Sequence, residues 1–424
     1  MHPALRVGYE GVAQLARALA AVAPDSDHKL LATFAARRGV IRRYQAFDRD
    51  RARPLLWMHA PSVGEGLQAR PLLERARRER PDAQLAYTWF SPSARVFAAS
   101  LDVDFCDALP FDDTPDMRAA VAALAPTALV FSKLDLWPTL AREASRQGTR
   151  LGMISASLAA RSSRRGGLAA SVLRDAYGRL ERVGAISTDD ADRLVALGVP
   201  ARRISVTGDT RYDQVWARAH DTGRIGALTE PLRSGRPTLV AGSTWPADEA
   251  PLLAAWTAVA SRHRDIRLVI APHEPRAAHL APILAWARGA GLRHATLGTA
   301  EAADADVVVV DRLGVLGDLY ALASLAFVGG GFHEAGLHSV LEPAAFGAPV
   351  LFGPRYTASR DAQLLLDADG ALALPTAAAI GSTLESWARG DAQWRRAGEH
   401  ARQVVHRGLG AVERSWALVR ELLG

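Results

Sequence analysis

Short apolar runs alternate with segments of helical spacing along most of the chain. The first run covers residues 54–58, and others follow at 84–90, 128–131, 151–155, 183–187 and 204–207. A second series lies at residues 238–241, 266–271, 307–310, 325–328 and 349–352. Alternation of strands and helices predicts parallel sheets with helices on both faces, so we expect an α/β fold.

The two series are separated by a polar stretch that shows no convincing strand and closes with Gly-Arg-Pro. A chain of 424 residues is also long enough for two domains. We expect N-terminal helices over residues 1–50, a domain over 51–213, a hinge over 214–237, a second domain over 238–384, and C-terminal helices over 385–424 that can cross back to the first domain. The predicted architecture is two doubly wound, Rossmann-like domains facing each other across a cleft.

Composition limits the class of protein further. Hydrophobic residues make up 49% of the chain and the formal net charge is +6, carried almost wholly by arginine because Lys29 and Lys133 are the only lysines. Arginine favours anionic partners such as phosphates, whereas no nucleic-acid recognition module or basic tail is present. Cys106 is the single cysteine, which excludes a disulfide framework, and its apolar surroundings predict a buried side chain.

The N-terminal region favours a membrane surface over a membrane span. No run approaches the roughly 18–20 apolar residues that a spanning helix needs, and Glu10 and Arg17 interrupt the first apolar stretch, so we expect no signal peptide and a cytoplasmic protein. Residues 7–22 are rich in alanine and leucine, and residues 29–44 mix apolar side chains with four arginines, Arg37, Arg38, Arg42 and Arg43. Such helices can lie on an anionic membrane; the alternative is ordinary packing against the N-terminal domain.

A strand, a glycine turn and a helix are predicted around His59-Ala60-Pro61-Ser62-Val63-Gly64-Glu65-Gly66. The turn places backbone N–H groups at a helix N-terminus, where an anionic ligand can approach. A loop that only held phosphate would gain nothing from a carboxylate at its centre, so Glu65 is interpreted as a base for a hydroxyl group. The alternative is a capping glutamate that favours the positive end of the helix dipole.

The densest candidate site is the segment of residues 329–343, Gly-Gly-Gly-Phe-His-Glu-Ala-Gly-Leu-His-Ser-Val-Leu-Glu-Pro. Three glycines let the backbone turn sharply and approach a ligand closely. We expect a helix to begin at Leu337, with His338 and Glu342 on one side by their i, i+4 spacing. Tight packing of helix on sheet would explain the glycines equally simply.

Two other strand ends carry small or cationic groups. Residues 242–246 read Gly-Ser-Thr-Trp-Pro, in which Ser243 or Thr244 is expected to cap the next helix. Residues 272–276 read Pro-His-Glu-Pro-Arg, so His273 and Arg276 follow the next strand. Together with the glycine segment these strand ends predict one anion site, although each could also be simple capping.

These motifs, taken together, resemble the 3-deoxy-D-manno-octulosonate (Kdo) transferases, inverting glycosyltransferases of the GT-B fold that move Kdo from CMP-Kdo onto a lipid A precursor. The matching segments are residues 57–66, 109–114, 135–138, 155–165, 187–198, 207–213, 242–249, 311–320 and 327–354. Their order and spacing agree together, which is more specific than any single glycine motif.

The resemblance implies a catalytic base at Glu65 and ribose binding by Glu342. It implies a donor site formed by Arg211, Gly242, Ser243, Thr244, His273, Arg276, Gly330, Gly331, His338, Ser339 and Glu342, and an acceptor site formed by Ser62, Gly64, Lys133 and Asp135. The partners that it implies are CMP-Kdo, a lipid A precursor (lipid IVA) and the anionic surface of the inner membrane, with the protein peripheral on the cytoplasmic face.

Two departures from the family pattern affect these assignments. Lys133 stands where the family often has glutamate in Glu-Thr-Glu-Leu-Trp-Pro, which bears on acceptor recognition, and Ser339 stands where it has asparagine. A hydroxyl can still donate or accept a hydrogen bond, so nucleotide binding is expected to survive. Arg211 replaces a frequent lysine and keeps the charge.

We expect no metal or other cofactor. Asp102 and Asp104, like the pair Asp112 and Asp113, superficially offer metal ligands, but we interpret all four as solvated edge or loop carboxylates. Two other functions fit the same residues, namely a GT-B transferase with another nucleotide-sugar donor and a catalytically silent nucleotide-sugar-binding protein.

Overall fold

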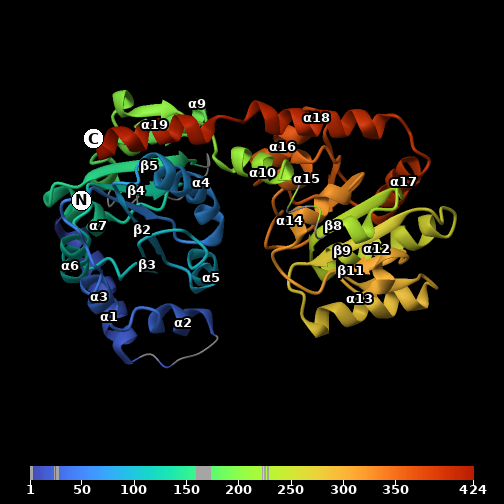
Figure 1. Cartoon of the computed structure of the whole chain (residues 1–424), viewed down its shortest axis with the longest axis horizontal. Coiled ribbons are helices and arrows are strands. Elements are labelled where there is room, and N and C mark those ends of the chain that lie inside the picture. Colours follow the sequence, from blue (N-terminus) through green and yellow to red (C-terminus); the bar gives the residue numbers. More distant parts are fainter. Residues whose placement is uncertain are drawn as a thin grey trace. The chain divides into compact units, whose positions relative to one another are not determined.

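The computed structural model describes residues 3–22, 24, 28–158, 173–221, 223, 226 and 229–424. Residues 159–165 of the family-like segment 155–165, and parts of the expected hinge, lie outside the described residues. The chain forms two compact units, one of Met1–Gln214 with Leu409–Gly424 and one of Val215–Gly408 (Figure 1). Each unit contains one seven-stranded parallel sheet, so the predicted class of two doubly wound Rossmann-like domains is confirmed.

The sheet of unit 1 has the strand order β3-β2-β1-β4-β5-β6-β7. Its strands are β1 (Leu55–His59), β2 (Gln84–Trp89), β3 (Phe105–Ala108), β4 (Ala128–Ser132), β5 (Arg150–Ala156), β6 (Arg182–Ala185) and β7 (Ile204–Val206). The direction of strand addition reverses between β1 and β4, which pair in parallel. In such sheets this switch point leaves a crevice at the carboxyl ends of the two strands, where ligands bind.

Helices cover both faces of this sheet. They are α1 (Pro3–Val22), α2 (Lys29–Ala35), α3 (Val40–Gln45), α4 (Val63–Glu79), α5 (Arg95–Ala98), α6 (Thr114–Leu124), α7 (Pro138–Arg146), α9 (Thr188–Leu197), α10 (Arg211–Ala219) and α19 (Ala411–Leu423), with 3-10 turns at η1 (Pro92–Ala94) and η3 (Ala201–Arg203). The boundary between the units falls within α10. In Figure 1, α19 lies beside β5, and it buries Trp416, Val419, Leu422 and Leu423 in one core of unit 1.

The sheet of unit 2 has the order β10-β11-β9-β8-β12-β13-β14, with its switch point between β8 and β12. Its strands are β8 (Thr238–Thr244), β9 (Arg267–Pro272), β10 (His294–Thr296), β11 (Val307–Val309), β12 (Leu325–Val328), β13 (Val350–Phe352) and β14 (Ala371–Ala373). Its helices are α12 (Pro246–Ala260), α13 (Ala277–Gly289), α14 (Leu316–Leu319), α15 (Leu341–Ala345), α16 (Arg360–Asp367), α17 (Ala377–Ala388) and α18 (Gln393–Arg407), with 3-10 turns at η4 (Glu230–Leu232), η5 (Ala300–Ala303) and η6 (Tyr320–Leu322).

Two side-chain predictions for unit 1 are wrong. Cys106 is exposed, because β3 is the edge strand of the sheet and its central residues turn away from the core. Asp112 and Asp113 are buried rather than solvated. Asp113 accepts the N–H of Asp116 at the start of α6, and Asp112 accepts the N–H groups of Thr139 and Leu140 in α7, so both carboxylates satisfy helix N-termini.

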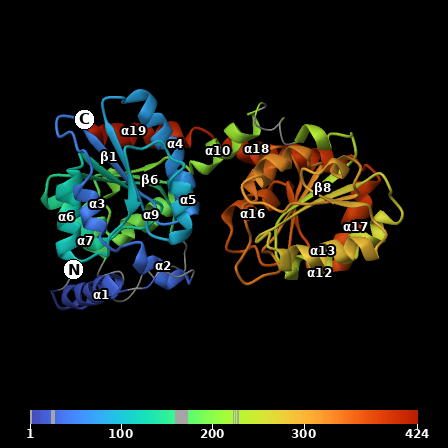
Figure 2. The same ribbon diagram turned by 60° about the horizontal axis from the view of Figure 1, so that its bottom comes forward.

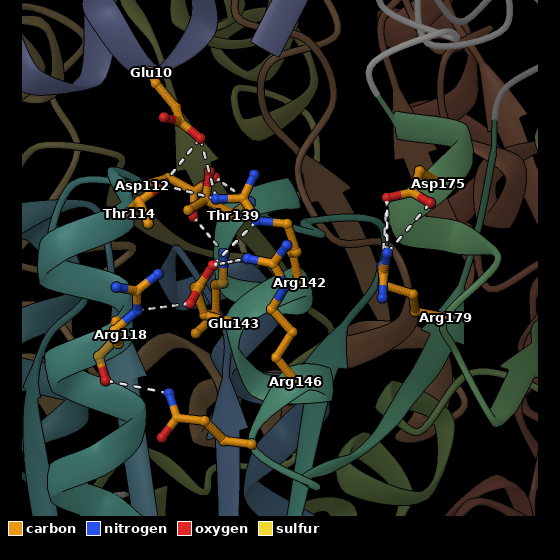
Figure 3. Close-up of polar contacts among 12 residues, drawn as sticks. Glu10, Asp112, Thr114, Arg118, Thr139, Arg142, Glu143, Arg146, Asp175 and Arg179 are labelled. Carbon is orange, nitrogen blue, oxygen red and sulfur yellow. Dashed lines mark hydrogen bonds and ion pairs between the residues drawn. The ribbon is translucent and has the colours of Figure 1, made fainter. Parts of the chain in front are cut away.

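A polar cluster attaches α1 to α6 and α7 (Figure 3). Glu10 of α1 accepts hydrogen bonds from Thr114 (2.9 Å) and Arg142 (3.1 Å). Below it, the buried carboxylate of Glu143 pairs with three arginines of these helices, Arg118, Arg142 and Arg146, each at 3.1 Å. Both charged side chains described in α1, those of Glu10 and Arg17, therefore pair with unit 1, since Arg17 contacts Asp113 and Asp116.

The opposite face of α1 is apolar and exposed. Val7, Val12, Leu15, Leu19 and Val22 are between 46% and 79% exposed. Figure 2 shows α1 at the outer surface of unit 1. None of the described helices is both long enough and apolar enough to cross a membrane.

Two of the four arginines of residues 29–44 contact unit 1 and do not form the expected basic surface, whereas Arg38 and Arg42 are exposed. Arg37 is buried, with its guanidinium 3.9 Å from the centre of the Phe90 ring, and burial lowers its pKa to about 9. Arg43 pairs with Asp107 at 2.6 Å. The packing alternative holds for α3, because Val40 and Tyr44 belong to the core of unit 1.

Candidate active site

Glu65 lies at the switch point of unit 1, in the first turn of α4. The helix begins directly after the turn that follows β1, with Ser62 as its N-cap. Gly66 is needed for packing, since a Cβ there would lie 2.4 Å from the Phe97 ring, whereas a Cβ on the exposed Gly64 would make only an ordinary contact, 3.8 Å from Ser62 Oγ. Close packing of α4 therefore requires the glycine at position 66 and not the one at position 64.

Both oxygens of Glu65 contact side chains. Lys133 Nζ lies 3.1 Å from Oε1, and Ser62 Oγ donates a hydrogen bond to Oε2. Burial raises the pKa of the carboxyl, but the Ser62 hydrogen bond and the Lys133 charge outweigh burial, so the pKa is lowered overall. Ser62 makes no side-chain hydrogen bond to the backbone of its helix, and Glu65 is ionised at neutral pH, as a base must be.

Ser132, which the sequence did not identify, ties the end of β4 to the first turn of α4. Its hydroxyl, at the end of β4, donates to the backbone oxygen of Glu65 (2.9 Å), which places Lys133 next to α4. Gln68, three residues after Glu65 in α4, donates a hydrogen bond to Asp209 at 3.1 Å. A serine that ends a strand carries no sequence signal beyond its position, which is why it was missed.

Arg211 belongs to unit 1, apart from the other predicted donor-site residues. Its guanidinium donates to Asp209 Oδ2 from Nε (2.9 Å) and from Nη2 (2.7 Å), and Asp209 is bonded to Gln68. The structure therefore connects Arg211 to the neighbourhood of Glu65. Asp135, the fourth predicted acceptor residue, is half-buried in the loop between β4 and α7.

In unit 2, the cap of α12 differs from the prediction. Neither Ser243 nor Thr244 caps the helix. Trp245 is the N-cap, and Asp248 at the third helical position accepts its N–H at 3.0 Å. Ser243 instead occupies an irregularity at the end of β8, with a φ of 54°, and Thr244 donates to Glu249 at 2.8 Å. A carboxylate three residues after the cap is a known start signal, so Asp248 could have been found from the sequence.

Asp248 also holds the glycine segment. Its buried carboxylate accepts the N–H of Gly330 at 2.8 Å and that of Phe332 at 2.9 Å. The glycines are required by close backbone packing, because a Cβ on Gly330 would lie 2.0 Å from the oxygen of Gly336 and one on Gly331 would lie 2.3 Å from the nitrogen of Gly353. Gly242 likewise leaves room for Tyr320, whose hydroxyl would lie 2.2 Å from a Cβ. The packing explanation thus accounts for these glycines.

Four aromatic rings gather where β8, β9 and β12 end. Trp245 stacks on His333 (4.3 Å between ring centres) and on His273 (4.5 Å), and His273 stacks on His338 (4.5 Å). Trp245 Nε1 donates to His338 Nε2 at 3.2 Å, so the neutral imidazole of His338 carries its proton on Nδ1. Burial, together with the neighbouring imidazoles, lowers the pKa of His338 to about 4.

His273 is neutral as well, since burial lowers its pKa. His273 and His338 therefore present neutral hydrogen-bonding rings and not the cationic group expected of His273. Arg276 supplies the positive charge on this side. Its side chain is 77% exposed, with Glu274 3.7 Å away.

The helix predicted from Leu337 is wrong. The structure has irregular chain over residues 337–340, where Ser339 is exposed, and α15 begins at Leu341. Pro343 lies in the first turn of α15, which favours the later start. Proline lacks the N–H that an interior helical position needs and is most easily accommodated in the first turn, although Pro71, Pro251 and Pro282 lie inside α4, α12 and α13. A helix begun at Leu337 would place Pro343 in its second turn.

Glu342 is consequently separated from His338 and sits at the start of α15. Burial raises the pKa of its carboxyl, opposed by the charge of Arg218 and reinforced by that of Asp318. Arg218 itself donates to Asp318 at 2.7 Å. Within the described part of the chain, Glu342 makes neither a side-chain hydrogen bond nor an ion pair, so its oxygens are available to a ligand.

No group of three or more His, Cys, Asp or Glu side chains among the described residues could hold a metal ion.

Comparison with known proteins places the chain among named relatives. Residues 32–214 match the family model of 3-deoxy-D-manno-octulosonic-acid transferase (kdotransferase). A 3-deoxy-D-manno-octulosonic acid transferase of Bordetella pertussis is 31% identical over 319 residues, which cover 72% of this chain and 73% of that protein. The enzyme of the same name from Haemophilus influenzae is 26% identical over 375 residues, or 87% of each chain.

Solved structures agree on the fold. UDP-GlcNAc 2-epimerase from Neisseria meningitidis, bound to UDP-GlcNAc, matches 87% of this chain and 99% of its own with a TM-score of 0.61 and 12% identity. A similar epimerase from Listeria monocytogenes gives a TM-score of 0.58 at 13% identity, covering 86% of this chain and 97% of its own. At this level of identity the likeness concerns the fold alone.

Proposed function

The chain belongs to the 3-deoxy-D-manno-octulosonic acid (Kdo) transferase family, and from this premise we propose that it transfers Kdo from CMP-Kdo to the hydroxyl of a lipid A precursor, lipid IVA. The chain is a glycosyltransferase that transfers Kdo in lipopolysaccharide biosynthesis. The observation that carries the proposal is an ionised glutamate at the switch point of unit 1, held by Lys133 and Ser62.

Glu65 is the proposed base. As the acceptor oxygen bonds to the anomeric carbon of Kdo, its proton passes to the Glu65 carboxylate, and the bond between that carbon and the phosphate oxygen breaks to release CMP. The attack comes from the face opposite the leaving group, which inverts the anomeric centre. Ser62 orients the carboxylate through its hydrogen bond to Oε2.

Unit 2 is the proposed donor-binding unit. Glu342 has oxygens available for the ribose hydroxyls of CMP, and Arg276 carries an exposed positive charge for the phosphate. The Nδ1–H of His338 and the ring of His273 add neutral donors, and preorganised donors of this kind stabilise developing negative charge. We assign no metal to the reaction, because these groups can meet the charge of the departing phosphate.

We also propose that α1 holds the protein at the cytoplasmic face of the inner membrane. Its outward face is apolar while its described charges pair inward with unit 1. A helix of this type lies in the interface with its apolar face among the lipids.

Mass spectrometry of lipid IVA after incubation with CMP-Kdo and the protein tests the function. We expect the acceptor mass to increase by one or more Kdo residues, with CMP as the co-product. Other nucleotide sugars serve as controls. Transfer of a different sugar, or CMP binding without any transfer, would contradict the proposal.

A further inference from the structure

The Glu65 carboxylate has a side-chain contact on each of its two oxygens. Lys133 occupies Oε1 at 3.1 Å and Ser62 occupies Oε2. Each oxygen keeps a second lone pair that can accept a proton. The Lys133 charge nevertheless stabilises the ionised carboxylate and so makes Glu65 a weaker base while the pair persists.

Lys133 is held in place by its backbone. Its φ is 62°, in the left-handed region that lysine rarely adopts. The backbone N–H of Lys133 donates to the oxygen of Ile154 in β5 at 2.9 Å, and the preceding Ser132 is bonded to the backbone of Glu65. An unfavourable backbone conformation, fixed from both sides, aims this lysine at α4.

The ammonium group is nevertheless accessible to a substrate. The Lys133 side chain is 47% exposed, whereas that of Glu65 is 17% exposed. An ion pair with one solvated partner is weak, and a second oxyanion can compete for the cation. Ser62, by contrast, is the N-cap of the helix that carries Glu65 and moves with it. Lys133 is the contact that can give way.

We propose that Lys133 is a positioning residue that pairs with Glu65 in the free enzyme and is drawn away by a substrate oxyanion, which removes the neighbouring cation and makes Glu65 a stronger base. The inference rests on the proposed role of Glu65. Until a substrate arrives, the positive charge of Lys133 offsets the negative charge of the Glu65 carboxylate. Two sources can supply the oxyanion, namely a phosphate of the lipid acceptor, or the carboxylate or phosphate of CMP-Kdo.

The pH dependence of the reaction distinguishes an ion pair that breaks on substrate binding from a permanent ion pair. The acid limb of kcat/KM reports the free enzyme and that of kcat reports the substrate complex. In Lys133→Met, Glu65 loses its cation in the free enzyme, so its pKa rises and the acid limb of kcat/KM moves to higher pH. The acid limb of kcat stays where it is in the wild type, because there Lys133 has already left Glu65.

The other titratable group coupled to Glu65 would not move the acid limb of kcat/KM while leaving that of kcat in place. The titratable or charged groups coupled to it are Lys133, from the loop after β4, and Tyr87, from β2. Burial raises the pKa of Tyr87, so it keeps its proton across the range measured. Lys133→Arg keeps the positive charge, so the acid limbs of kcat/KM and of kcat should lie where they do in the wild type. Lys29→Met, which changes the only other lysine, is the matched control.

Michaelis constants identify the source of the oxyanion. In Lys133→Met, the KM of the substrate that supplies the oxyanion should rise roughly tenfold, the effect of one lost charge-assisted contact. A rise for lipid IVA but not for its dephosphorylated form assigns the acceptor phosphate, and a rise for CMP-Kdo assigns the donor. Movement of both acid limbs, or of neither, overturns the proposal, as does a KM that changes for no substrate.

A last measurement needs no turnover and therefore also applies if the proposed function fails. Protein labelled with 13C-lysine gives two Cε signals, and Lys29→Met identifies the one from Lys133. Glu65→Gln should shift that signal in the free protein and leave it unchanged in protein saturated with CMP-Kdo or with lipid IVA. A difference between wild type and Glu65→Gln that persists with each of these ligands overturns the inference, whereas absence of Kdo transfer by the wild type overturns the proposed function alone.

Discussion

Three carboxylates of this protein have different protonation behaviour because their neighbours differ. Glu65 has a cation and a hydroxyl beside it, which lower its pKa despite burial. Asp112 is fully buried without a cation in direct contact, and burial raises its pKa to about 7. The pKa of Glu342 is raised by burial too. The surroundings therefore leave the Glu65 carboxyl ionised, whereas the helix-capping carboxyl of Asp112 retains its proton up to about pH 7.

Glu65→Gln tests the base. Glutamine keeps the size and the hydrogen bonds of glutamate but cannot take up the acceptor proton, so turnover should fall by roughly 10²–10⁴-fold. CMP affinity, measured by calorimetry on the same preparation, should remain unchanged. Glu74→Gln, an exposed position on the same helix, is the control. Near wild-type transfer by a folded Glu65→Gln protein would direct attention to Asp135.

Asp112 makes stability depend on pH. The folded state keeps the Asp112 proton up to about pH 7, whereas the unfolded chain releases it near pH 4, so folding takes up a proton between these values and the free energy of unfolding falls as pH rises through this window. The shift corresponds to about 4 kcal/mol. Chemical denaturation from pH 4 to pH 8 should show this fall in the wild type relative to Asp112→Asn. Parallel curves for the two proteins would contradict the raised pKa.

Glu342→Ala addresses the ribose assignment. Loss of charge-assisted hydrogen bonds to the ribose should weaken CMP binding by roughly 1.5–3 kcal/mol. The affinities of the wild type and of Glu342→Ala are compared by calorimetric titration with CMP and with cytosine, since only CMP carries the ribose. Equal CMP affinity in a folded variant would make Glu342 a structural residue.

Sequence reasoning at the residue level succeeded where a local pattern placed one side chain. Glu65 follows a strand and a glycine turn, and the structure puts it at the carboxyl edge of the sheet. Its pairing with Lys133 could not be foreseen, because 68 residues separate the two and only the adjacency of β1 and β4 brings them together. The same holds for the stack of Trp245, His273 and His338, which three different strand ends assemble.

At the level of elements, the glycine segment depends on one carboxylate from another helix. Asp248 at the start of α12 accepts N–H groups of Trp245, Gly330 and Phe332. This arrangement ties β8 and β12 together at the switch point of unit 2. The conformation of the segment is thus set by packing and by Asp248, before any ligand binds.

Asp248→Ala should leave these buried N–H groups without an acceptor. An unsatisfied buried donor costs about 1–3 kcal/mol, so we expect the free energy of unfolding to fall by about 3 kcal/mol or more and CMP binding to weaken. Asp248→Asn retains one carbonyl oxygen. Its free energy of unfolding and its CMP affinity should therefore lie between those of the wild type and of Asp248→Ala. Glu274→Ala, which removes an exposed carboxylate of the same unit, is the control. Unchanged hydrogen exchange in the glycine segment of Asp248→Ala would show that packing alone holds it.

Strands that carry a continuous apolar or β-branched run were predictable. Such runs gave β2, β5 and β9, which are buried along most of their length, and also β7 at one sheet edge. The edge strands β10 and β14 were missed, because His-Ala-Thr and Ala-Leu-Ala contain no such run. The start of α15 was predicted four residues too early, because the glycine turn continues as irregular chain through residues 337–340.

At the scale of the whole molecule, apolar surface and charge are distributed unevenly. The formal net charge is +6, yet the apolar face of α1 contains none of the described charged side chains. A positively charged protein with one apolar helix face is suited to anionic lipid. The sequence indicated this property, but it attributed it to the arginines of residues 29–44, two of which are engaged within unit 1.

Vesicle sedimentation tests the role of α1. The double variant Val12→Asn with Leu15→Asn removes two of its exposed apolar side chains and should weaken binding to anionic vesicles by roughly tenfold. CMP affinity should not change. Leu313→Asn, at a 75% exposed leucine of unit 2, is the matched control. Equal sedimentation of the double variant and the wild type would exclude α1 as the attachment site.

The placement of α19 affects the order in which the protein can form during synthesis. Unit 2 is one continuous stretch of chain, whereas unit 1 needs residues 409–424, which leave the ribosome after all of unit 2. Until then the groove that receives Leu422 beside Gly152 is empty and its apolar lining faces water. The second unit can therefore reach its native state while the first is still waiting, and the unfinished first unit is the part of the nascent chain that a chaperone would protect.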